Sequence, residues 1–202
     1  MTVSNYSAIT IGWVAIATGI VGLLGLVFII LFFTVGQPFG TLNDICIGLA
    51  AILSAVLAWM LYPGNHVQAP LLSQVALVVA FLGALVVVIG SVLVISGVTG
   101  WYLAGLYMTA GNAFIGSWLL ALNYSALRNI SFPYGLVIFG IISSVILVLG
   151  LMTIPGIFNG IDAWDAAPWY VNYIGQAGAL GWLVLYPIWC VLIGRFILLG
   201  YV

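Results

Sequence analysis

Six long apolar stretches follow one another along the chain, separated by short segments that are richer in Gly, Pro or polar residues. A helix needs about 20 mostly apolar residues to cross roughly 30 Å of hydrocarbon, and each stretch reaches that length. The runs are continuous and lack the alternation that a membrane β-strand of about ten residues requires. The expected membrane-spanning helices cover residues 9–33, 42–62, 71–96, 101–124, 132–154 and 170–199.

Turn-forming residues mark the boundaries between these stretches. Pro63, Gly64, Asn65 and His66 predict a break that places the single histidine in a loop. The longest polar segment, residues 155–168, precedes the sixth stretch. The pattern therefore predicts an all-α fold, in which residues 1–202 form one polytopic bundle of six transmembrane helices.

Composition agrees with a membrane location. Hydrophobic residues make up 66% of the chain and charged residues 2%, and the mean hydropathy is +1.39. Soluble domains carry roughly 25% charged residues, so this chain cannot cover itself with a soluble surface. A net charge of −1 gives no basic patch, which argues against a nucleic-acid partner. We expect a multi-pass protein of the plasma membrane or bacterial inner membrane, with the lipid bilayer as its immediate partner.

The few charges predict an orientation. Six crossings place both termini on one side of the membrane, and Arg128 and Arg195 fall on that side. Asp44, Asp162 and Asp165 fall on the other. Because Lys and Arg concentrate in cytoplasmic segments, both termini are expected to be cytoplasmic.

Thr41, Asn43 and Asp44 come just before the second predicted helix and have two interpretations. The spacing of Thr41 and Asp44 is that of a capping box, with Asp in place of the usual Glu or Gln. Alternatively, these residues could line an outer vestibule. For Asp162 and Asp165 we expect a solvated loop that skims the membrane, because a metal site needs more than two ligands.

Uncharged polar residues inside the helices could form a path for a small neutral solute. The candidates are Thr109, Asn112, Asn172 and Gln176, and Pro187 predicts a kink in the sixth helix. The alternative is that these side chains make hydrogen bonds between helices within a packed bundle. The direction in which they point separates the two hypotheses.

Several mechanisms are disfavoured by the residues present. One histidine and no glutamate exclude a His-Glu-x-x-His metal site and a haem held by two histidines of one chain. We therefore expect no enzymatic activity, no cofactor and no resident metal. The sequence favours a non-catalytic membrane subunit or scaffold that assembles with itself or with other membrane proteins. A passive channel or transporter for a small neutral solute is the alternative, and lipid or pigment binding is a weaker one.

Overall fold

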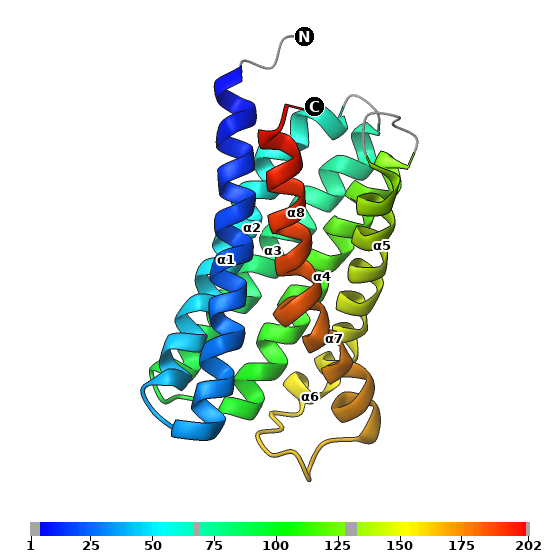
Figure 1. Cartoon of the computed structure of the whole chain (residues 1–202). Coiled ribbons are helices and arrows are strands. Elements are labelled where there is room, and N and C mark those ends of the chain that lie inside the picture. The colour runs from blue at the N-terminus through cyan, green and yellow to red at the C-terminus, as the bar shows by residue number, and fades with distance from the viewer. Residues whose placement is uncertain (1–4, 67–68, 128–132, 201–202) are drawn as a thin grey trace.

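The computed structural model describes residues 5–66, 69–127 and 133–200, and over these residues the chain is a bundle of helices without strands (Figure 1). The first four rods of the bundle are single helices: α1 (Asn5–Val35), α2 (Phe39–His66), α3 (Pro70–Ile95) and α4 (Trp101–Ala126). The fifth rod joins α5 (Tyr134–Val148), a 3₁₀ segment (Leu149–Thr153) and α6 (Ile154–Phe158). The sixth rod consists of a π-helical segment (Tyr170–Gly175), α7 (Gln176–Leu180), a second π-helical segment (Gly181–Leu185) and α8 (Tyr186–Leu198).

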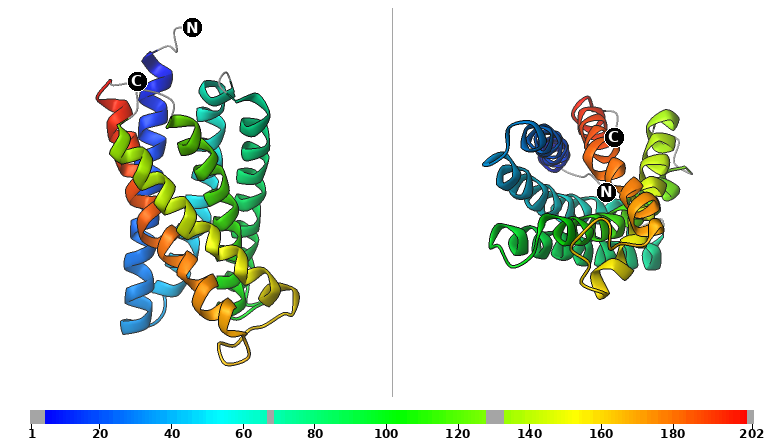
Figure 2. Two further views of the ribbon diagram at one scale, coloured as in Figure 1. Left: turned by 90° about the vertical axis from the view of Figure 1, so that its right-hand side faces the viewer. Right: turned by 90° about the horizontal axis from the view of Figure 1, so that it is seen from below.

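The six rods form a closed bundle in chain order. Each rod packs against the next along the chain, and α8 returns to pack against α1. The start of α1 and the end of α8 lie together at one end of the bundle, and the loop between α6 and the sixth rod lies at the other (Figures 1 and 2). The predicted all-α, six-helix bundle with both ends on one side is confirmed. We call the end that holds the termini the terminal end and the opposite end the loop end.

Five of the rods are long and apolar enough to cross a membrane. These spans are Ala8–Val35, Phe39–Pro63, Pro70–Ile95, Tyr134–Phe158 and Tyr170–Leu198. Helix α4 is not among them, although it has the same 26 residues as α3. In α4 14 residues are buried, against eight in α3, because α4 packs against α2, α3 and the fifth rod. A helix that faces protein more than lipid can carry more polar side chains, which explains its lower hydropathy.

The outward faces of the rods are strongly apolar. Along α3, for example, Val78 is 58% exposed and Leu85 56% exposed. Such continuous apolar surface is stable only when it meets hydrocarbon or another apolar surface. The structure therefore supports a membrane-embedded protein.

Glycines bring the helix backbones close together. A Cβ atom added at Gly83 of α3 would lie 2.5 Å from the carbonyl oxygen of Gly111 in α4, and one added at Gly111 would lie 2.6 Å from the oxygen of Gly83. Gly12 of α1 and Gly194 of α8 make a similar contact, with a Cβ at Gly194 2.6 Å from the Gly12 oxygen. Small residues at such contacts are typical of helix association in membranes.

The predicted end of the second helix is wrong. Helix α2 continues through Pro63 and ends at His66, and it begins at Phe39 instead of residue 42. A proline removes one backbone hydrogen bond, and near a helix end this loss is small enough for the last turn to continue. His66 therefore belongs to the helix and not to a loop. The fifth rod also continues beyond the predicted residue 154, through α6 to Phe158. Arg128 and the predicted start of that helix at residue 132 lie outside the described residues.

Candidate functional site

The sixth rod is irregular near its middle, where α1 packs against it. Pro187 has no N–H group to donate to the carbonyl of Leu183, and the five residues Gly181–Leu185 before α8 are π-helical. A Cβ at Gly22 of α1 would lie only 2.7 Å from Cγ of Pro187. The proline ring therefore fits where α1 has no side chain. Single π turns inside helices occur often at functional sites, which directs attention to this region.

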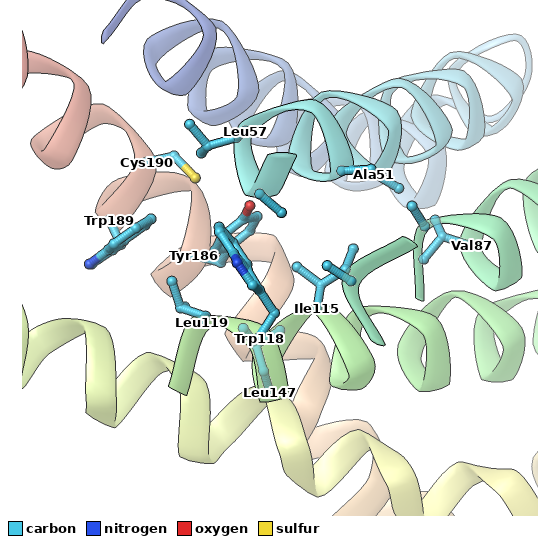
Figure 3. Close-up of a cluster of buried hydrophobic side chains, with 14 of the residues drawn as sticks. Ala51, Leu57, Val87, Ile115, Trp118, Leu119, Leu147, Tyr186, Trp189 and Cys190 are labelled. Carbon is cyan, nitrogen blue, oxygen red and sulfur yellow. The ribbon is translucent and has the colours of Figure 1, made fainter. Parts of the chain in front are cut away.

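Tyr186 and Ser54 join the sixth rod to α2 beside this irregular turn. The Tyr186 hydroxyl donates to Oγ of Ser54 at 2.8 Å, and the Ser54 hydroxyl donates to the carbonyl of Ala50 at 2.7 Å. Ser54 is 1% exposed and Tyr186 4% exposed. Figure 3 shows the Tyr186 hydroxyl directed toward α2, and its ring is stacked on Trp189 with centroids 6.3 Å apart. This polar contact lies inside an otherwise apolar core.

A small cavity of about 20 Å³ lies next to the Ser54–Tyr186 pair. It is lined by residues of α1, α2, α4 and the sixth rod: Thr18, Gly22, Ile47, Ala50, Ser54, Asn112, Trp182, Tyr186 and Pro187. The Thr18 hydroxyl donates to the Val14 carbonyl at 2.8 Å, and the Asn112 amide donates to the Met108 carbonyl at 2.9 Å. We call this space the midplane cavity, because it lies about halfway along the rods.

The four residues proposed for a solute path do not converge on this cavity. Asn112 alone lines it. The Thr109 side chain faces the fifth rod, since a Cβ at Gly150 would lie 2.9 Å from Cγ2 of Thr109. Asn172 lies toward the loop end, where it accepts a hydrogen bond from the Tyr102 hydroxyl at 2.5 Å. Gln176, at the start of α7, is partly exposed and lines neither the midplane cavity nor a smaller cavity between α2, α3 and α4.

At the loop end, Asp162 holds the long loop against the start of α4. Its carboxylate accepts hydrogen bonds from the backbone N–H groups of Gly100 at 2.6 Å and Leu103 at 2.9 Å. Helix α4 has no capping side chain within its own sequence neighbourhood, so Asp162 supplies the cap from 62 residues away. Asp165 is exposed, as expected for a solvated loop.

Asn172 fixes the other side of the same loop. Its amide donates to the carbonyl of Trp164 at 2.8 Å and to that of Ala167 at 3.3 Å. Tyr102 packs edge-on against Trp164, with ring centroids 6.0 Å apart. The loop between α6 and the sixth rod is thus solvent-exposed at Asp162 and Asp165 but firmly attached to α4. We call this set of contacts the loop-end tie.

The capping box expected around Thr41 is not formed. Because α2 begins at Phe39, Thr41 lies inside its first turn. Gln37 takes the capping role, since its Oε1 accepts from the backbone N–H and the hydroxyl of Thr41, each at 3.4 Å. Asn43 is 4% exposed and donates to the Asp44 carboxylate at 3.3 Å. A Cβ at Gly25 of α1 would lie 3.7 Å from Oδ1 of Asn43, so this side chain faces α1 and not an open vestibule.

Sequence reasoning missed two features of the site. Ser54 and Tyr186 are 132 positions apart, and no local pattern pairs them. Trp182 has a buried indole Nε1 without a hydrogen-bond partner, although tryptophan in a membrane helix usually suggests an interfacial position. The π-helical turn before Pro187 is what places this side chain at the midplane cavity.

Across the described parts of the chain, no three His, Cys, Asp or Glu side chains come together as a metal site would require. In comparisons with known proteins, no protein-family model, no curated protein and no solved structure matches this chain.

Proposed function

We propose that this chain is a non-catalytic membrane protein that acts as an embedded subunit or scaffold of a homo- or hetero-oligomeric assembly. The observation that carries the proposal is the way in which the bundle interior is filled. Backbones approach closely at Gly83 and Gly111, and most buried hydroxyl and amide groups donate to carbonyls of their own helix. Ser54, Asn112, Asn123, Ser143 and Ser144 all bond to the carbonyl four residues earlier.

The small size of the internal spaces supports the same proposal. The midplane cavity measures about 20 Å³, and a second cavity near the terminal end, between α2, α3 and α4, measures about 10 Å³. Thr109 packs against the fifth rod, and Asn172 is hydrogen-bonded to Tyr102 near the loop end, so neither lines the midplane cavity. A bundle packed in this way is suited to present its outer faces to other membrane helices.

A passive path for a small neutral solute is the second candidate. Asn112 lines the midplane cavity beside the irregular turn at Pro187, and this combination favours it over lipid or pigment binding. For this function the rods at the cavity would have to separate, because the cavity is too small for any solute larger than water.

Native mass measurement tests the proposal. The chain is extracted from its own membranes into lipid nanodiscs and weighed with whatever remains bound. We expect a fixed stoichiometry with other membrane proteins or with further copies of this chain. A population of single chains without companions would contradict the proposal, and a homogeneous oligomer that conducts solute in liposome flux assays would favour the channel.

Photo-cross-linking then locates the contact face. A photo-reactive amino acid replaces Val78, which faces outward on α3, or Val145, which faces outward on α5. The control position is Ala80, which has no exposed area. An embedded subunit gives strong cross-links from at least one outward position and none from Ala80, whereas equal labelling by lipid at both outward positions argues against a fixed partner.

A further inference from the structure

The inward face of α1 is covered in one half of the bundle and uncovered in the other. Ala15 and Thr18, toward the terminal end, are 0% and 1% exposed. Leu26, Ile29 and Phe33 continue the same face toward the loop end, at helical spacings of three and four residues. Leu26 and Ile29 are partly exposed, and Phe33 is 66% exposed. The inward side of α1 therefore loses its cover between the midplane cavity and the loop end.

Helix α4 shows the same change along the face that carries Asn112. Asn112 is 6% exposed, and Asn123, on this face nearer the terminal end, is 3% exposed. Toward the loop end the face continues through Gly105 and Trp101. A Cβ at Gly105 would meet no atom within 4 Å among the described residues, and Trp101 is 58% exposed. The Trp101 ring meets that of Phe33 in α1, with centroids 6.1 Å apart, so the uncovered parts of the two helices face each other.

The sixth rod does not fill the space between these two faces. Helix α1 packs on α8 and on Gly181–Leu185, and from there the two rods diverge toward the loop end (Figures 1 and 2). Leu180, directly before that segment, is already 61% exposed. We call the space that remains the loop-end seam, and it is bounded by Leu26, Ile29 and Phe33 of α1 and by Trp101 and Gly105 of α4.

The length and lining of the loop-end seam match a hydrocarbon chain. From Gly22, at the midplane cavity, to Phe33, a rise of about 1.5 Å per residue gives roughly 16 Å. This is close to the depth of one leaflet, about half of a 30 Å hydrocarbon core. The bounding side chains carry no charge and no hydroxyl group, so water would gain few hydrogen bonds there. A helix, about 10 Å across, is too wide where the rings of Phe33 and Trp101 meet.

We propose that the loop-end seam binds one acyl chain of a phospholipid from the leaflet at the loop end. The acyl chain covers the inward faces of α1 and α4 that the diverging sixth rod leaves exposed, and it ends near Gly22 and Asn112 at the midplane cavity. This lipid is part of the folded structure and stays bound when the bulk lipid is exchanged. The proposal holds whether the protein is a subunit or a channel.

Site-specific photo-cross-linking tests the proposal. A diazirine amino acid replaces Ile29, on the seam, or Ile30, which is 55% exposed on the outer face of the same helix. The protein is extracted from its own membranes, exchanged into detergent until the bulk lipid is removed, and illuminated. Mass spectrometry then identifies the adducts. We expect a phospholipid adduct, joined through its acyl chain, at Ile29 and detergent adducts alone at Ile30.

Two variants fill the seam from opposite sides. Gly105→Leu places a side chain in the open space beside α4, and Leu26→Trp enlarges the side chain on α1. Gly135→Leu, at the start of α5, is the matched control, since a Cβ there also meets no atom within 4 Å among the described residues. We expect the phospholipid adduct at Ile29 to be lost in each filling variant that folds and to be retained in Gly135→Leu.

Four results would overturn the proposal. Detergent adducts alone at Ile29 would show that the seam retains no lipid. A water adduct at Ile29 would show a hydrated space and favour the channel, and a protein adduct would show that a partner fills the seam. A phospholipid adduct that survives in every folded filling variant would place the lipid outside the seam.

Discussion

Two polar contacts hold distant parts of this bundle together, and they differ in their surroundings. The loop-end tie has several bonds, and the two that the Asp162 carboxylate accepts from the start of α4 are exposed. The Ser54–Tyr186 pair has a single bond between side chains and lies inside an apolar core. Exposed bonds can be replaced by bonds to water, whereas buried polar groups depend on the partners that the protein supplies. We therefore expect the stability of the loop-end tie to come from the number of its bonds, and that of the Ser54–Tyr186 pair to come from the packing around it.

The largest effect is expected from truncating Tyr186. The Tyr186→Ala variant removes a buried aromatic ring that is stacked on Trp189, and it also removes the hydrogen bond that Ser54 accepts from Tyr186. Large aromatic-to-alanine changes in cores cost about 3–5 kcal/mol. Denaturant titration in mixed micelles measures the free energy of unfolding, and a loss below that of the loop-end variant described next would show that packing is not what this contact provides.

An intermediate effect is expected at the loop-end tie. Asp162→Ala removes the cap of α4, and the loss of a capping side chain costs about 0.5–2 kcal/mol. Asp165→Ala, in the same exposed loop, is the control and should leave the free energy of unfolding unchanged. An equal loss of unfolding free energy in Asp162→Ala and Asp165→Ala would mean that the charge of the loop stabilises the protein and the cap of α4 does not.

The smallest effect is expected when only the buried hydroxyl is removed. Tyr186→Phe keeps the ring and deletes the bond to Ser54, and hydrogen bonds between membrane helices average about 0.6 kcal/mol. Tyr134→Phe, at an exposed position at the start of α5, is the matched control. A loss as large as that of Tyr186→Ala would reverse the comparison, because the bond and not the packing would then dominate.

The sequence was sufficient for the six-helix architecture because each rod is a long, mostly apolar stretch that turn-forming residues separate from the next. It failed at boundaries where a single local rule was applied, as at Pro63, which α2 passes through, and at Thr41, which lies inside the helix it was expected to cap. Near a helix end, the backbone tolerates one lost bond, and more than one nearby side chain can supply a cap. Gln37 supplies it here.

The candidate site could be predicted only in part, because its contacts join residues that are far apart along the chain. Asn112 was recognisable as a buried polar residue, and Pro187 as a helix interruption. The partnership of Ser54 with Tyr186, and the capping of α4 by Asp162, depend on how the rods pack. A local signal was available for the second, since Gly100 precedes α4 with no capping side chain of its own.

The enclosure of α4 has a consequence for how the chain enters the membrane. Each long helix must leave the insertion machinery for lipid, and apolar side chains favour that step while polar ones oppose it. Helix α4 carries Asn112 and Asn123 at buried positions, and it is not among the helices that are apolar enough to cross a membrane on their own. We therefore expect α4 to enter the bilayer together with α3, so that the most central helix of the finished protein is the one that depends most on its neighbours during biosynthesis.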